Sequence, residues 1–267
     1  MLLGVLGLAA TALVLASPPA PALVWTEPAP VMDLSGQGDV LAAATQGGVV
    51  LWNISAGTAR VVTTAQGLPT NVTLAASIAP ELSELRVATT NGLARGWFEG
   101  PWTSLDARQD EKGNPYYTCM PRPGGGWIAG GDRGRLVAWQ VDRIDSLQIP
   151  TPRGRIVGLA HLPDWTERRR APHELRLQVT PAFPVGLIAA LDNDGVWILR
   201  SFGSWTRWLK IGEIDGLPSE RTLDVVTDVQ GDAWVATTRG IARIGPGITV
   251  QAWPGGSLLA QRSSVLL

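Results

Sequence analysis

The residues best suited to ligand chemistry lie in the segment 163–180. They are one tryptophan, three consecutive arginines and one histidine: Trp165, Arg168, Arg169, Arg170 and His173. An indole beside three guanidinium groups could hold a carboxylate, a sulfate or a polysaccharide, because arginine pairs with planar anions through parallel hydrogen bonds. We therefore predict that these five residues bind a ligand. The alternative is a solvated charged loop, or a hairpin extension that binds nothing.

The sequence predicts neither a metal site nor a catalytic set. His161 and His173 flank the segment, but zinc needs three or four ligands at a suitable spacing. The run from Asp192 to Gly195 resembles part of a calcium loop and lacks the glutamate that completes such a loop, so a plain turn is predicted there. No Gly-x-Ser-x-Gly elbow and no phosphate loop occurs. We predict no metal and no cofactor.

An internal repeat defines the elements that must position these residues. The sequence from Val87 to Arg95 (VATTNGLAR) returns from Val235 to Arg243 as VATTRGIAR, and Gly-Leu-Pro and then Thr-Leu precede both copies. Glycines at successive spacings of 44, 42, 61 and 45 residues mark five copies of this unit: Gly48, Gly92, Gly134, Gly195 and Gly240. A period in the low forties is the length of one four-stranded propeller blade, and such blades must stack around an axis.

We therefore predict an all-β fold: a β-propeller with about five recognisable blades, a partial sixth and a ring that could be incomplete. The propeller domain is predicted at 23–267, with blades at 31–69, 70–113, 114–152, 153–218 and 219–256 and the partial blade at 257–267. The 61-residue spacing reflects the segment 163–180, which is an insertion into the fourth blade. It follows an inner strand there, so its loop is expected near the mouth of the axial channel.

The composition of the chain restricts its possible binding partners and suggests a packing role for its tryptophans. The net charge is −1 and no run of five like charges occurs, which argues against binding of nucleic acid or of an acidic membrane surface. Several of the twelve tryptophans fall at matching repeat positions, where large flat side chains would fill the wedge between blades. Cys119 is the single cysteine, so no internal disulfide can form, and we predict a buried, inert thiol.

The N-terminal segment 1–22 predicts export. An apolar run from Leu2 to Ala16 is too short to span a bilayer and is followed by small residues, including an A-x-A pattern from Ala20 to Ala22. These features are typical of a secretory signal peptide, although Arg60 is the first basic residue of the chain. The predicted location is periplasmic or secreted. An uncleaved N-terminal membrane anchor and a cytoplasmic protein are the alternatives.

The last repeat copy resembles the two-component regulator propeller repeat of bacterial sensor proteins. The residues that carry the resemblance are Gly216-Leu217-Pro218, Trp234-Val235-Ala236-Thr237 and Gly240-Ile241-Ala242-Arg243. The copy at 67–95 has Arg86 where that family usually has tryptophan. The resemblance implies an exported propeller that senses or binds something outside the cytoplasm.

These features together predict a non-enzymatic propeller that binds an unknown ligand or protein partner outside the cytoplasm. Two other functions stay open. The first is a propeller enzyme, such as a streptogramin-type lyase or a glycan-active hydrolase. The second is a scaffold subunit that pairs with another chain through exposed blade edges.

Overall fold

The computed structural model describes residues 29–79, 84–105, 115–122, 125–140, 143–150, 153–162, 186–202, 205–245 and 247–255. In this part of the chain, twenty strands form five four-stranded antiparallel sheets, which confirms the predicted all-β class. The predicted signal segment 1–22, insertion 163–180 and partial blade 257–267 lie outside the described residues.

Each sheet is a meander of four strands that follow one another in the chain. The first sheet contains β1 (Val31–Gln37), β2 (Val40–Thr45), β3 (Gly48–Asn53) and β4 (Thr58–Val62). The second contains β5 (Thr73–Ile78), β6 (Glu84–Thr89), β7 (Gly92–Trp97) and β8 (Trp102–Leu105). The third contains β9 (Tyr116–Pro121), β10 (Trp127–Gly131), β11 (Arg135–Gln140) and β12 (Arg143–Gln148).

The last two sheets follow the same order. The fourth contains β13 (Ile156–His161), β14 (Leu187–Leu191), β15 (Gly195–Phe202) and β16 (Trp205–Ile211). The fifth contains β17 (Thr222–Thr227), β18 (Ala233–Thr237), β19 (Gly240–Gly245) and β20 (Thr249–Pro254). The short 3-10 helices are η1 (Thr64–Gln66), η2 (Asp132–Gly134) and η4 (Glu213–Asp215).

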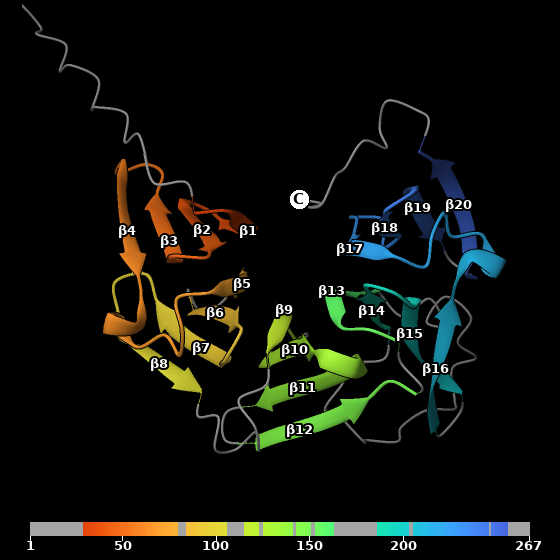
Figure 1. Cartoon of the computed structure of the whole chain (residues 1–267), viewed down its shortest axis with the longest axis horizontal. Coiled ribbons are helices and arrows are strands. Elements are labelled where there is room, and N and C mark those ends of the chain that lie inside the picture. The colour runs from red at the N-terminus through yellow and green to blue at the C-terminus, as the bar shows by residue number, and fades with distance from the viewer. Residues whose placement is uncertain are drawn as a thin grey trace, which may run out of the picture.

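The sheets are the blades of a propeller that does not close into a ring. Figure 1 shows the first strands of the sheets, β1, β5, β9, β13 and β17, around the centre, and the fourth strands at the outside. The sheets follow one another along an arc, and the first and fifth sheets lie on either side of its opening (Figure 1). The incomplete ring agrees with the prediction.

Apolar side chains between neighbouring sheets form the core. Four clusters of buried residues fill the four junctions, and each combines side chains of two consecutive sheets. Trp127, Trp197 and Trp208 are among the buried residues of the core, as the packing role of tryptophan predicts. Cys119 is buried between the second and third sheets, and burial raises the pKa of its thiol well above the usual range. The predicted inert thiol agrees with this environment.

All five inner strands contain a β-bulge near their start. One extra residue of the inner strand interrupts the register with the second strand of the sheet: Met32, Leu74, Tyr117, Val157 and Leu223. A bulge bends the strand and redirects the side chain of the extra residue. The same irregularity therefore presents one side chain of each blade to the axis.

The threonine of the repeated Thr-Leu pair joins consecutive blades. Thr73 is fully buried at the start of β5; its hydroxyl donates to the Thr45 carbonyl oxygen at 2.7 Å and accepts from the Thr45 backbone N–H at 2.7 Å. Thr222 occupies the same position in β17, and its hydroxyl donates to the Leu191 carbonyl. The turn after the second strand of one blade is thus held to the inner strand of the next.

Replacement of Thr73 by valine is expected to lower the free energy of unfolding by about 2 kcal/mol, because the buried N–H and C=O of Thr45 lose their partner. Denaturant unfolding followed by tryptophan fluorescence would measure it. Thr58→Val is the matched control, since Thr58 is exposed at the start of β4. Equal stability of the two variants would contradict the joining role of Thr73.

Candidate functional site

A cavity of about 220 Å³ lies at the axis, where all five inner strands meet. Its lining residues come from the bulges and the positions beside them: Met32, Asp33, Leu74, Ala75, Tyr117, Thr118, Arg155, Val157, Leu223 and Asp224. The bulge positions supply four aliphatic side chains and one phenol. The positions that follow them supply most of the polar groups. Apolar walls with a few polar groups are the usual composition of a small-molecule site.

Asp33 lies in this cavity directly after the bulge of β1. Its Oδ1 accepts the Leu34 backbone N–H at 2.9 Å, and its Oδ2 accepts the Ala76 backbone N–H at 3.0 Å, so the carboxylate links β1 to β5. Burial raises the pKa of Asp33, and the two backbone hydrogen bonds oppose this effect. Asp224 occupies the equivalent position of β17, where its Oδ1 accepts the Val225 backbone N–H at 2.8 Å.

Arg155 and Tyr117 form another polar part of the lining. The guanidinium carbon of Arg155 lies 4.8 Å from the centroid of the Tyr117 ring, which is a cation–π contact. Arg155 also pairs with Asp192, with 2.9 Å between Nε and Oδ2. Burial raises the pKa of Tyr117, and a hydrogen bond to Asp132 raises it further, so the phenol stays protonated at neutral pH.

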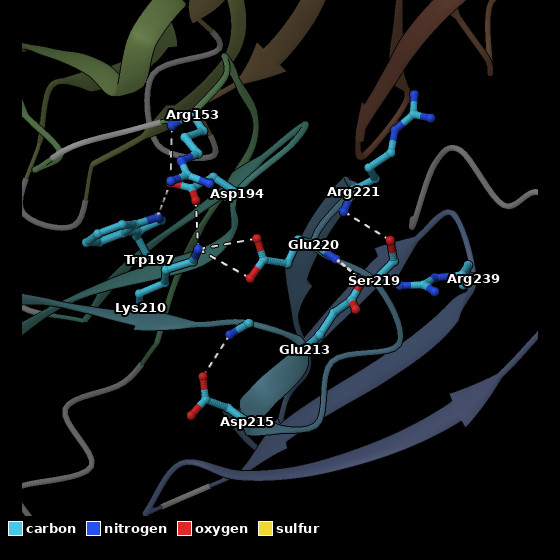
Figure 2. A network of polar contacts seen from close by, with 11 residues as sticks. Arg153, Asp194, Trp197, Lys210, Glu213, Asp215, Ser219, Glu220, Arg221 and Arg239 are labelled. Atoms are coloured by element: carbon cyan, nitrogen blue, oxygen red, sulfur yellow. Dashed lines mark hydrogen bonds and ion pairs between the residues drawn. The ribbon is translucent and has the colours of Figure 1, made fainter.

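A polar network lies at the turn between β14 and β15 (Figure 2). Asp194 is almost fully buried there and accepts three hydrogen bonds: from Lys210 Nζ at 2.7 Å, Trp197 Nε1 at 3.1 Å and the Arg153 backbone N–H at 3.2 Å. Lys210 also contacts Glu220, at 3.3 Å. Burial lowers the pKa of Lys210, but its bonds to Asp194 and Glu220 outweigh this and raise it.

The turn at Asp192–Asp194 was predicted to be a plain turn rather than a calcium loop. Its two carboxylates contact cations of the protein, Asp192 with Arg155 and Asp194 with Lys210. The described residues contain no cluster of three or more His, Cys, Asp and Glu side chains that could hold a metal ion. The network therefore fixes the turn and the link into β17.

The five residues predicted to bind a ligand all lie outside the described residues: Trp165, Arg168, Arg169, Arg170 and His173. Their role stays a prediction. Sequence reasoning did not identify the axial residues Asp33, Tyr117, Arg155 and Asp224. One signal was available for Asp224, because it directly follows the repeated Thr-Leu pair that marks the start of an inner strand.

Comparisons with solved structures show the propeller fold. The chain is similar to the extracellular domain of the putative hybrid two-component system BT4673 from B. thetaiotaomicron, with a TM-score of 0.58 and 14% identity over 85% of this chain and 35% of that one. It is also similar to a streptogramin B lyase, with a TM-score of 0.62 and 13% identity over 87% of this chain and 71% of that one. A third similar structure is the β-propeller domain of Cps50 (Swd1) from Myceliophteria thermophila, with a TM-score of 0.57 and 14% identity over 84% and 73% of the two chains.

The likeness concerns the fold alone, since identities of 13–14% are low and the proteins differ in function. The chain spans about a third of the length of the BT4673 extracellular domain. No protein-family model matches the sequence, and no curated protein is significantly similar to it. Within the described residues, no helix has the length and apolar character needed to cross a membrane.

Proposed function

We propose that this chain is an extracytoplasmic, sensor-type propeller that binds a small ligand in its axial cavity. The observation that carries the proposal is the cavity itself, whose lining combines aliphatic bulge residues with the polar groups of Asp33, Tyr117, Arg155 and Asp224. The first strands of all five described sheets, or the residues directly beside them, contribute to its lining. Rigid elements that converge on one cavity favour specific binding.

Two further observations support the sensor assignment and the location. The repeat resembles that of bacterial two-component regulators, and the fold is shared with the extracellular domains of two such systems, BT4673 and BT3049. The segment 1–22 has the composition of a secretory signal. The proposal is ligand binding without turnover, and a propeller enzyme is the alternative that the test must distinguish from it.

Leu74→Trp is the variant that tests the cavity. The indole would fill the space beside the bulge of β5, and we expect at least a tenfold loss of affinity for any ligand held at the axis, because the ligand must be excluded or shifted. Thermal-shift screening of wild type and variant against monosaccharides, amino acids, small amines and lactones would find such ligands. Isothermal titration would then give their affinities.

Ile54→Trp is the matched control, since Ile54 is 61% exposed in the turn between β3 and β4 and does not line the cavity. Binding that both variants retain would place the ligand elsewhere and overturn the proposal. Consumption of a lactone or glycan, lost in Leu74→Trp alone, would favour the enzyme alternative. A stable oligomer without any ligand would favour the scaffold alternative.

A further inference from the structure

An open groove of about 520 Å³ lies at the junction of the fourth and fifth sheets, beside the turn between β14 and β15. Its lining residues are Arg153, Gly154, Asp192, Asn193 and Arg221. Arg153 and Gly154 precede β13, and Arg221 precedes β17, so two consecutive blades contribute to one groove. The described linings of this groove and of the axial cavity have no residue in common. The groove is therefore a second candidate site.

Hydrogen bonds fix the backbone on the fourth-sheet side of the groove. The Arg153 backbone N–H donates to Oδ2 of Asp194 at 3.2 Å, and the Arg155 backbone N–H donates to Oδ1 of Asp192 at 3.1 Å. The Asp192 backbone N–H donates in return to the Arg155 carbonyl oxygen at 3.0 Å. The segment before β13 is thus held against the turn, which fixes the backbone of Arg153 while its side chain is exposed.

The backbone of Arg221 is held in a similar way on the fifth-sheet side. Its N–H donates to Ser219 Oγ at 3.1 Å, and its carbonyl oxygen accepts from the Thr238 backbone N–H at 3.0 Å. The exposed side chain of Arg221 points away from the polar network (Figure 2). Because the backbone on both sides is already ordered, a ligand at this groove would pay little for ordering it.

The carboxylates beside the groove are paired with other cations. Asp192 is the one acidic residue of the described lining, and its Oδ2 lies 2.9 Å from Nε of Arg155. Asp194 and Glu220 follow in the same network, and both contact Lys210. These acidic groups therefore do not compensate the two arginines that line the groove.

The guanidinium groups of Arg153 and Arg221 have neither a hydrogen bond nor an ion pair within the described part of the chain. The groove thus has two unpaired positive charges on an ordered backbone, and the potential there favours an anion. A guanidinium presents a planar set of donors that fits a carboxylate through two parallel hydrogen bonds.

We propose that this groove binds a small dicarboxylate, with one carboxylate group at Arg153 and the other at Arg221. The two arginines project from different blades, so two acid groups on one carbon chain suit them better than a single compact anion. A volume of about 520 Å³ is in the range of small-molecule sites. The site is distinct from the axial cavity and goes beyond the function proposed for that cavity.

A series of acids tests the chemical class. Ligand-observed NMR titration of the full chain at low ionic strength would compare malonate, succinate, glutarate and adipate with acetate, succinamide and phosphate. The tightest dicarboxylate is expected to bind at least about tenfold more tightly than acetate or succinamide, because it pairs with two guanidinium groups rather than one or none. Its affinity should fall as salt is added, since exposed charges are screened.

Arg153→Gln and Arg221→Gln are each expected to weaken dicarboxylate binding about tenfold, to the level of acetate, since each leaves a single guanidinium group in the groove. Glutamine keeps the backbone hydrogen bonds, so both variants should fold, and unfolding curves would verify this. Arg133→Gln is the matched control, because Arg133 is an exposed arginine of η2 that lines neither the groove nor the axial cavity. An equal loss in the control would show general attraction by positive charge and overturn the site.

Three further outcomes would overturn the inference. These are failure of every dicarboxylate to bind, binding of phosphate at least as tight as that of the best dicarboxylate, and binding that persists in both glutamine variants. Leu74→Trp should leave dicarboxylate affinity unchanged, because Leu74 lines the axial cavity. Dicarboxylate binding that Leu74→Trp abolishes and both glutamine variants retain would support the axial function while overturning this second site. Loss of the axial function alone would leave the groove site in place.

Discussion

Replacement of Gly240 by alanine is expected to lower the free energy of unfolding by about 3 kcal/mol or more, against about 1 kcal/mol for Gly92→Ala. The two glycines occupy the same repeat position, and both have a positive φ, 142° at Gly240 and 100° at Gly92. A Cβ atom at Gly240 would lie 2.2 Å from the Trp253 carbonyl oxygen, whereas one at Gly92 would meet nothing within 4 Å. Alanine at either position is strained by the positive φ. Of the two variants, only Gly240→Ala also has the steric clash.

Denaturant unfolding of the two alanine variants would distinguish the loss of stability caused by backbone strain from the loss caused by the steric clash. The clash involves backbone atoms of β20, so relief requires a shift of the outer strand of the fifth blade rather than a new side-chain rotamer. Equal losses of stability at the two positions would show that β20 can shift to relieve the clash without a measurable loss of free energy of unfolding. That result would contradict close packing of the outer strand against the turn.

Asp194→Asn is expected to cost about 3 kcal/mol, because it leaves the charge of Lys210 with Glu220 as its remaining partner and places an amide among three hydrogen-bond donors. Asp194 is 2% exposed, and its partners hold the turn after β14, the strand β16 and the segment before β13 together. Loss of this carboxylate should therefore loosen the fourth blade at one end.

The control is Glu213→Gln. Glu213 also forms an ion pair, with Arg239, but both side chains are about half exposed, and surface pairs of this kind contribute little to stability. Thermal unfolding of the two variants at low and high salt would compare them. The loss in Asp194→Asn should persist at high salt, since buried pairs are screened little, and a loss that salt removes would contradict the buried role.

The sequence alone determined the architecture of the blades. The repeated VATT-x-G-x-AR segment contains a turn that requires a positive φ at its glycine, and apolar residues on either side that alternate between the two faces of a strand. These are local properties, so one chain segment is sufficient to reveal them. The second strand of the last blade, β18 (Ala233–Thr237), contains the first residues of this repeated segment, from Val235 to Thr237.

Local sequence patterns did not identify the candidate site. Asp33 and Asp224 lie at opposite ends of the described chain, and neither belongs to a catalytic or binding motif. They share a cavity because five blades stack along an arc that brings the first and last inner strands to the same axis. Sequence reasoning instead favoured the charged segment 163–180, whose role stays a prediction.

There is a physical reason why the sequence determined some features and the tertiary structure determined others. Turn chemistry and strand alternation depend on neighbours within a few residues, so the sequence by itself determined the repeat, the blade size and the all-β class. The axial cavity depends on where bulges occur and on how far each blade rotates relative to the previous one. Those angles result from side-chain packing between sheets, and only the tertiary structure decided which residues of the five inner strands face one another.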